Sequence, residues 1–194
     1  ILSFNNTFQN DGSKFGQTIP GRAMSPAATL APTPENPEVQ QLIGLNDNAD
    51  RVAYFGLSNP NDAPATYRLR FFDTSGHQIA VSPDLTLSRF GQKQFQLQEI
   101  RDFGVTSQSD YRVQTEQTAG GQVFPYGANL RLATQDPSFI GTGPSASSKL
   151  FLVGSLSQPG LNNSLFQTDV VVSNPTPAAL AFDVSFISTG VNAT

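Results

Sequence analysis

The chain has 194 residues, of which only 13% are charged, and its 15 acidic and 11 basic side chains give a net charge of −4. This charge density is about half the usual globular value, whereas Asn, Gln, Ser and Thr together supply about a third of the residues. So few cations exclude the basic stripe that binding to a phosphate backbone requires, and nucleic acid is not an expected partner. The absence of cysteine excludes disulfides and thiolate metal sites.

The sequence shows neither a membrane span nor a signal peptide. No apolar run approaches the length of about 18 residues that a spanning helix needs, and the opening residues 1–10 are too polar for a signal peptide. The chain begins at Ile1, which fits either a processed mature protein or a fragment of a longer one. Both are compatible with secretion, so we expect an extracellular or cell-surface location.

Residues 1–20 are predicted to be the terminal strand segment of a repeat, with Ile1, Phe4 and Phe8 as large apolar residues. Residues 21–40 are predicted to be a linker, because five prolines occur from position 20 to position 37 among Ala, Ser and Thr. Such a segment is extended and semi-rigid.

Residues 41–140 are predicted to form one complete antiparallel β-sandwich, the first copy of the repeat. Apolar and polar residues alternate over 65–71, as in a strand with one buried face. The buried side is expected to hold Tyr67, Leu69 and Phe71, and the wet side Arg68 and Arg70. Residues 93–98 and 110–115 show the same period.

One short helical turn is predicted inside this sandwich. Leu97, Ile100 and Phe103 recur at a spacing of three residues, and Gly104 follows as a residue that can end a helix.

Residues 141–149 are predicted to be a Gly/Ser/Pro linker, and residues 150–194 to be the opening strands of a second copy. The three strands expected there cover residues 150–156, 166–173 and 180–187. Period-two alternation predicts a buried face and a wet face. The buried face would carry Phe166, Phe182, Val184 and Phe186, and the wet face Asp183 and Ser185.

Two internal correspondences support this division of the chain. Ser58-Asn59-Pro60 recurs as Ser173-Asn174-Pro175 at an offset of 115, and the alternating strand that follows recurs with it. Residues 1–4 resemble 123–126, and residues 15–19 resemble 136–140, at offsets of 122 and 121. The chain is therefore predicted to contain the end of one repeat, a whole repeat and the start of another.

These signals resemble a known type of repeat. The segments that carry the resemblance are Thr-Asp-Val-Val-Val-Ser-Asn-Pro at 168–175, Tyr-Gly-Ala-Asn at 126–129 and Thr-Gln-Asp-Pro-Ser-Phe-Ile at 134–140. They are similar to the tandem β-sandwich repeats of secreted and cell-surface proteins of environmental bacteria. The resemblance implies an all-β fold of immunoglobulin-like sandwich repeats, one complete and one partial, the partial one completed by strand addition. It implies no catalytic motif.

No catalytic residue, cofactor or metal is expected, and the chain is not predicted to be an enzyme. His77 follows Gly76 at a predicted hairpin turn, where a solvated histidine explains it better than a general base does. Residues 46–50 begin like a calcium loop, but Arg51 and Leu57 replace the required glycine and glutamate, so an EF-hand is rejected. An irregular calcium site and a hydrolase built on paired carboxylates stay open as alternatives.

Five positions are candidates for glycosylation. Three are acceptor asparagines, Asn5, Asn162 and Asn192, in a number that chance alone explains. The other two, Thr29 and Thr33, lie in the Pro-rich segment, whose extended chain exposes hydroxyl groups. Glycans are therefore an allowed partner but carry no argument about function.

The expected function is structural. An incomplete sandwich exposes apolar side chains and unpaired strand edges, which proteins cover or pair. The sequence therefore predicts a subunit of an extracellular fibre or surface assembly that polymerises with itself, head to tail, by β-strand complementation. The residues expected to make this contact are Ile1, Phe4, Phe8, Phe166, Phe182 and Phe186. The alternative is a non-catalytic carbohydrate-binding or adhesive spacer module of a secreted enzyme.

Overall fold

Antiparallel strands dominate the described part of the computed structural model, with one short helix beside them, which confirms the all-β prediction. The structure describes residues 4–8, 16–20, 32–106, 108–142, 157–159, 165–168, 170–174 and 178–185. The chain divides into two compact units, Ile1–Ser145 and Ala146–Thr194.

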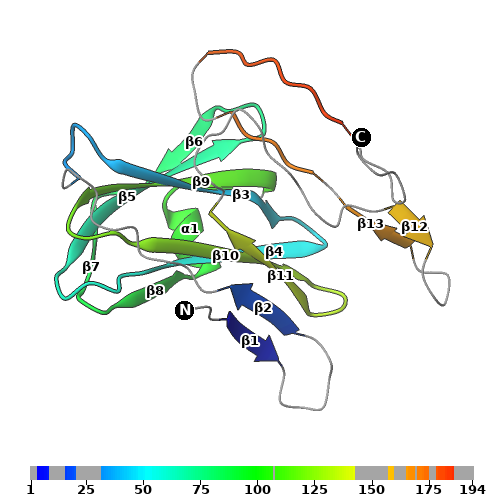
Figure 1. Cartoon of the computed structure of the whole chain (residues 1–194), viewed down its shortest axis with the longest axis horizontal. Helices are drawn as coiled ribbons and strands as arrows, with labels where there is room; N and C mark the ends of the chain where they lie inside the picture. Colours follow the sequence, from blue (N-terminus) through cyan, green and yellow to red (C-terminus); the bar gives the residue numbers. More distant parts are fainter. Residues whose placement is uncertain are drawn as a thin grey trace, which may run out of the picture. The chain divides into compact units, whose positions relative to one another are not determined.

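Two sheets account for most of the first unit (Figure 1). One has five strands: β3 (Glu38–Asp47), β9 (Gln108–Ala119), β5 (Ala65–Asp73) and β6 (Gln78–Val81) in that order, with β7 (Leu85–Leu87) also paired to β5. The other has four, in the order β11 (Asp136–Gly141), β10 (Phe124–Arg131), β4 (Arg51–Ser58) and β8 (Gln92–Phe95). Every pairing in both sheets is antiparallel.

Two hairpins form separate two-stranded sheets. The first joins β1 (Phe4–Phe8) to β2 (Gly16–Pro20), and within the first unit β2 contacts β11. The second joins β12 (Ser157–Pro159) to β13 (Leu165–Gln167) in the second unit.

Aromatic rings join the two sheets into one hydrophobic core. Phe55 of β4 packs edge-on against Phe71 of β5, with ring centroids 5.9 Å apart, and stacks on Phe95 of β8 at 4.9 Å. Phe103 contacts both Phe71 and Phe95, at 6.1 and 6.2 Å. Edge-on and offset rings at these distances add stabilisation to the burial of their area. The core therefore lies between the layers and receives side chains from both.

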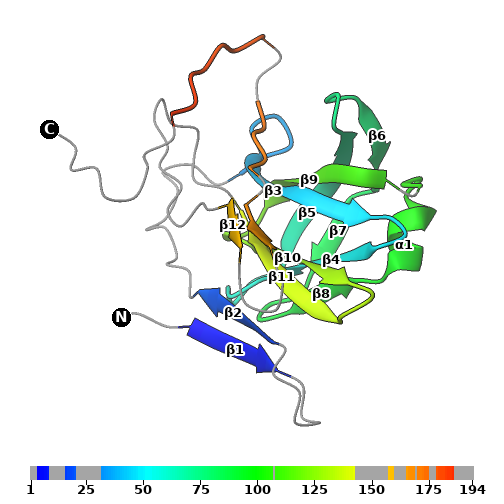
Figure 2. The same ribbon diagram turned by 90° about the vertical axis from the view of Figure 1, so that its right-hand side faces the viewer.

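The only helix in the described part of the chain is α1 (Leu97–Asp102), which follows β8 and leads toward β9. In Figure 2 it lies at one end of the two layers. Ile100 is buried, and Gly104 has φ +101°, a left-handed conformation that favours glycine after a helix. The predicted turn over 97–103 is confirmed. Within the described residues, no helix has the length and apolarity needed to cross a membrane.

The alternation predicted for the first copy is also confirmed. Tyr67, Leu69 and Phe71 of β5 are buried, while Arg68 and Arg70 are half-buried on the other face of the sheet. One boundary differs from the prediction, because β3 begins at Glu38, inside the range expected to be linker. Its first residues pair with the end of β9, which extends the strand beyond the apolar pattern.

We predict that Phe71→Ala lowers the free energy of unfolding by about 3–5 kcal/mol, because the ring is fully buried between the sheets. Arg68 lies on the opposite face of the same sheet. Arg68→Ala removes the exposed ion pair with Asp84 and is expected to lower the free energy of unfolding by about 1 kcal/mol or less. Urea unfolding followed by circular dichroism measures both values. Equal costs would show that the assignment of the two faces is wrong.

Candidate functional site

A single asparagine organises the turn between β4 and β5. Asn59 is 1% exposed, and its Nδ2 donates to the carbonyl oxygen of Ala63 at 2.8 Å and to that of Ser88 at 2.9 Å. Its Oδ1 accepts from the backbone N–H of Asn61 at 3.1 Å. A buried amide whose groups are all bonded fixes local geometry strongly. This side chain therefore ties the β4–β5 turn to the turn between β7 and β8.

The same local contact occurs at the matching position of the second copy. The Nδ2 atom of Asn174 donates to the carbonyl oxygen of Ala178 at 2.6 Å, again across four residues. Asn174 lies 115 residues after Asn59, as the sequence correspondence requires. The motif Ser-Asn-Pro-x-x-Ala thus makes one kind of side-chain-to-backbone turn twice in the chain.

The surroundings of the two turns differ completely. In the first copy, Phe55, Leu57 and the apolar residues of β5 are buried on either side of Asn59. The residues that lie 115 positions later are all exposed: Val170, Val172, Leu180, Phe182 and Val184. Residues 170–174 and 178–185 belong to no strand. The segments predicted to open a second copy, residues 170–174 and 178–185, therefore present apolar side chains to solvent.

This finding corrects the burial predicted for the second copy. Phe182 is 63% exposed and Val184 is 80% exposed, the polar Asp183 between them is exposed too, and the strand predicted over 180–187 does not form between 178 and 185. The physical reason is the missing sheet: β5 is paired with β6, β7 and β9, which come from residues 78–119, and its apolar face packs against the four-stranded sheet. The described residues of the second unit contain no counterpart of those strands.

The hairpin β1–β2 has the same register as β10–β11. Phe4 pairs with Pro20 and Phe8 with Gly16, while Tyr126 pairs with Gly141 and Leu130 with Pro137. Offsets of 122 for the first strand and 121 for the second convert every β1–β2 pair into a β10–β11 pair. The offsets from the sequence thus agree with an independent feature, the backbone pairing of two hairpins.

β10 in turn is the neighbour of β4 along its whole length. Tyr126 lies opposite Gly56, and Gly127 lies opposite Phe55. A Cβ atom on Gly56 would lie 2.5 Å from the hydroxyl oxygen of Tyr126 on β10 and 2.6 Å from the backbone carbonyl oxygen of Lys93 on β8, so both neighbouring strands favour glycine here. The first copy therefore shows which segment covers β4 and how closely the two strands fit.

The remaining assembly and glycosylation candidates are placed only in part. Phe4, Phe8 and Asn5 lie on β1, and Phe166 lies on β13. Thr33 is exposed, with its hydroxyl oxygen accepting from the backbone N–H of Asn36 at 3.1 Å. The others lie outside the described residues, namely Ile1, Phe186, Thr29, Asn162 and Asn192.

His77 lies in the turn between β5 and β6, as the sequence predicts, and its side chain is 82% exposed. The carboxylate of Asp73 accepts hydrogen bonds from the backbone N–H groups of His77 and Ser75, at 2.9 Å each. The bond from His77, followed by that from Ser75, lowers the pKa of Asp73. Asp73 therefore acts as the turn's hydrogen-bond acceptor.

The loop at 46–50 forms an Asx turn. The side-chain oxygen of Asn48 accepts from the backbone N–H groups of Asp50 and Arg51, at 2.9 and 3.0 Å. Asn46 donates to Asp110 at 2.7 Å. The bonds to Asn48 use one of the side-chain oxygens that a calcium loop would need as a ligand. Among the described residues, no group of three or more His, Asp or Glu is placed to hold a metal ion.

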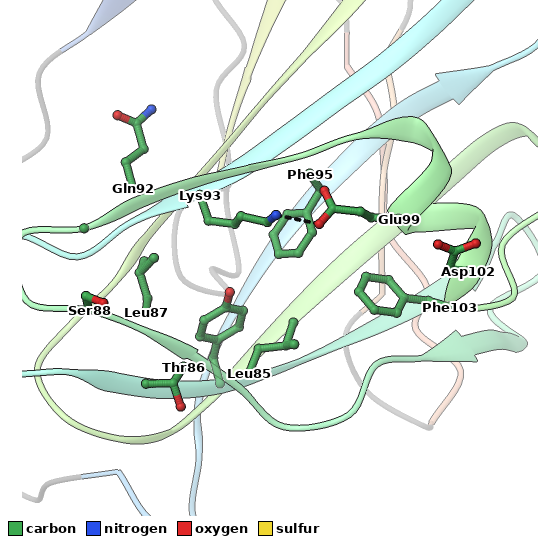
Figure 3. Close-up of a pocket in the computed structure, with 12 residues that line it drawn as sticks. Leu85, Thr86, Leu87, Ser88, Gln92, Lys93, Phe95, Glu99, Asp102 and Phe103 are labelled. Carbon is green, nitrogen blue, oxygen red and sulfur yellow. Dashed lines mark hydrogen bonds and ion pairs between the residues drawn. The ribbon is translucent and has the colours of Figure 1, made fainter.

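A pocket of about 460 Å³ lies beside β7, β8 and α1 (Figure 3). Tyr67 and Phe95 contribute buried rings, and the ion pair between Lys93 and Glu99 crosses its polar side. Lys93 and, next, the backbone N–H of Gln96 lower the pKa of Glu99. Burial, helped by Glu99, raises the pKa of Tyr67 to about 12. Tyr67 thus stays protonated at neutral pH and is no base.

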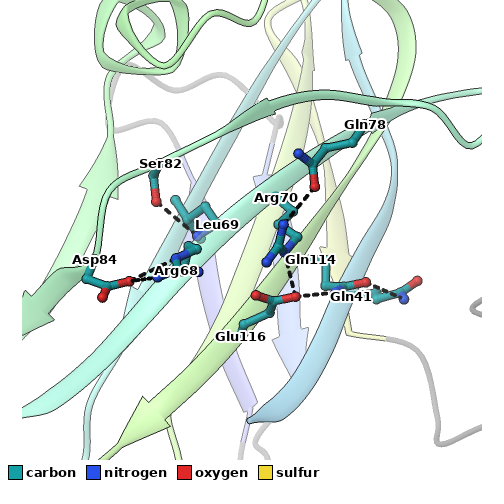
Figure 4. Close-up of polar contacts among 9 residues, drawn as sticks. All are labelled: Gln41, Arg68, Leu69, Arg70, Gln78, Ser82, Asp84, Gln114 and Glu116. Carbon is teal, nitrogen blue, oxygen red and sulfur yellow. Dashed lines mark hydrogen bonds and ion pairs between the residues drawn. The ribbon is translucent and has the colours of Figure 1, made fainter. Parts of the chain in front are cut away.

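The outer face of the five-stranded sheet carries a hydrogen-bonded polar row (Figure 4). Arg70 donates to Glu116 at 2.7 Å, and Gln114 donates to the same carboxylate oxygen at 2.9 Å. Gln41 donates to Gln114 at 3.2 Å, and Arg112 donates to Gln41 at 3.0 Å. Cross-strand pairs of this kind stabilise a sheet. The face that they form is polar and carries both positive and negative side chains.

Sequence reasoning missed the pocket and the role of Asn59. The pocket combines segments that are short and irregular, so no periodic pattern marks it. One signal was available, because Gln96 and Glu99 have the spacing of a capping box, which the structure forms at α1. For Asn59 the available signal was the repetition of the whole motif Ser-Asn-Pro-x-x-Ala.

Comparison with known proteins does not identify a family. No protein-family model matches the sequence, and no curated protein matches it. Among solved structures, the crystal structure of Thermotoga maritima 1070 has a TM-score of 0.40 and 13% identity, covering 56% of this chain and 93% of that one. The Anabaena sensory rhodopsin transducer has a TM-score of 0.35 and 12% identity, covering 50% and 97%. These similarities are too weak to support an inference about fold or function.

We predict that Asn59→Ala lowers the free energy of unfolding of the first unit by about 2–4 kcal/mol, because it removes the bonds of a buried amide to the carbonyl oxygens of Ala63, Leu87 and Ser88, of which the one to Leu87 is buried. Asn174→Ala is the matched control, since it removes the same local bond at an exposed site. Its effect is expected to stay within about 0.5 kcal/mol. Urea denaturation of both variants measures the difference, and similar losses would contradict the structural role given to Asn59.

We predict that Glu99→Gln destabilises the protein at pH 7 and that the deficit relative to wild type shrinks below about pH 4. The pKa of Glu99 is lowered in the folded state, so its contribution is present above the unfolded pKa and is lost as the pH falls through the folded pKa. Thermal unfolding at pH 7 and pH 3 measures it. Gln94→Ala, an exposed control on β8 without a titratable group, should show a difference from wild type that does not change with pH.

Proposed function

We propose that this chain is a structural subunit of an extracellular fibre or surface assembly and that it polymerises with copies of itself, head to tail. The observation that carries the proposal is the contrast between matching positions of the two copies. Leu57 and Leu69 are buried, whereas their counterparts Val172 and Val184 are exposed. Exposed apolar segments of this kind are normally covered by a partner.

The register of the terminal hairpin supports a second copy of this chain as that partner. The β1–β2 hairpin has the register of β10–β11, the hairpin that covers β4 in the first copy. A hairpin at one end and an uncovered counterpart of β4 at the other make a heterologous contact, which propagates into a filament unless it closes into a ring. The proposal includes the immunoglobulin-like repeat, completed by strand addition, and the extracellular location, which fits the low charge density.

The second candidate function is a carbohydrate-binding or adhesive spacer module. The polar row on the outer face of the five-stranded sheet favours it, because Gln41, Gln114 and Arg70 offer amide and guanidinium groups on one surface. These groups are already bonded to one another, so a sugar would have to compete with them. Size in dilute solution separates the two functions, since a spacer stays monomeric.

We predict that Val172→Lys raises the protein concentration needed for assembly by about tenfold or more, because it places a charge in the apolar segment to be covered. Val39→Lys is the matched control, an exposed valine on β3 of the first unit, and should assemble like wild type. Sedimentation and electron microscopy measure the assembled fraction. A wild-type chain that stays monomeric at every concentration would overturn the proposed function.

Removal of residues 1–20 tests the other end of the contact. The truncated chain is expected to remain monomeric or to aggregate without order, and a free peptide of residues 1–20 should cap wild-type ends and shorten the assemblies. Normal fibres from the truncated chain would show that the contact does not involve the hairpin.

A further inference from the structure

The first copy supplies a template for the contact between chains. β10 pairs with β4 in an unbroken antiparallel register, with Tyr126 opposite Gly56, Gly127 opposite Phe55 and Asn129 opposite Ala53. Two relations transfer this template to the ends of the chain. The turn asparagines relate β4 to residues 166–173, and the hairpin registers relate β10 to β1.

We infer that β1 of one copy pairs antiparallel with residues 167–171 of a second copy in one defined register. Phe4 lies opposite Val171, Asn5 opposite Val170, and Thr7 opposite Thr168. The inference rests on the proposed function and deepens it, because it names the acceptor segment and the alignment of the two strands. The occupant of the apolar segment at 170–172 is thus the hairpin β1–β2 of another copy of this chain.

The residue types agree with this alignment. β10 reads Tyr-Gly-Ala-Asn-Leu over 126–130, and β1 reads Phe-Asn-Asn-Thr-Phe over 4–8, with large apolar residues at both ends and small or polar ones between. In β10 the core-facing positions are Gly127 and Asn129, and Asn129 bonds to β3 through the backbone of Gly44 and Asn46. β1 thus keeps small or polar residues at the positions where β10 needs them.

The pair at the end of the register differs from its template, because Val171 stands where β4 has Gly56, so the Phe4 ring must turn aside from the position that Tyr126 occupies. Phe4 opposite Val171 is an aromatic residue facing a β-branched one, a combination that stabilises antiparallel strands. Val170, Val171 and Val172 are each about half exposed in the single chain, so pairing removes apolar surface from water as it adds main-chain hydrogen bonds. The inference concerns this segment alone, because residues 178–185 correspond to β5, whose neighbours belong to the other sheet.

The chain has no cysteine, so introduced pairs report the register directly. The full-length variant Asn5→Cys/Val170→Cys places the two thiols opposite each other, at a Cα separation of about 5 Å that a disulfide can bridge. Under mild oxidation we expect a ladder of disulfide-linked oligomers on a non-reducing gel. Thr7→Cys/Thr168→Cys is a second pair in the same register and guards against a folding defect in the first.

The matched control is Thr7→Cys/Val172→Cys, which lies four residues out of register, a separation of about 13 Å. It should give about tenfold less cross-linked oligomer than the pairs in register. Electron microscopy of each variant before oxidation records whether it assembles.

The outcomes separate the inference from the proposed function. Fibres that cross-link only through the control pair, or through none of the pairs, overturn the register and leave the proposed function standing. Disulfides formed only within single chains overturn both, because the hairpin then returns to its own second copy. Wild-type protein without assemblies also overturns both.

Discussion

The contact between Phe55 and Phe71 decides whether the first unit has a core. These two rings come from different sheets, and Phe95 and Phe103 complete the cluster around them. Each sheet has one apolar face, and exposing that face to water would cost free energy. Both sheets are therefore stabilised by packing these faces against each other. The position of α1 follows from it, because the helix carries the chain from β8 to β9 while Ile100 and Phe103 remain in the core.

The two asparagine turns separate local from tertiary causes of structure. Asn59 and Asn174 make the same bond to a carbonyl four residues later, so this bond forms with the motif in two different surroundings. Asn59 is buried, and β7 and the residue after it supply it with further acceptors within a surrounding core, whereas Asn174 is exposed. Within the described part of the chain, residues 170–174 lack the neighbouring strands that β4 has, so Asn174 keeps its local bond but the residues form no strand. The proposed assembly restores one of those neighbours from another chain.

Features that depend on short-range patterns could be predicted from the sequence. The alternation of β5 and the spacing of Leu97, Ile100 and Phe103 reflect which residues face the core, and both predictions are confirmed. The burial of Phe182 was predicted by the same alternation and is wrong for the single chain, because alternation shows which face is apolar and not whether a partner covers it. The pair Lys93–Glu99 depends on how β8 meets α1, which no periodicity encodes.

The glycine opposite Tyr126 has a consequence for how repeats avoid mispairing. Domain swapping exchanges equivalent strands between similar modules, and tandem copies are prone to it. At the position that corresponds to Gly56 the second copy has Val171, and a side chain there would meet the tyrosine ring at less than van der Waals distance. β10 therefore fits its own module better than the neighbouring acceptor. The absence of a side chain at Gly56 thus favours the pairing of β10 with β4 over its exchange to residues 166–173.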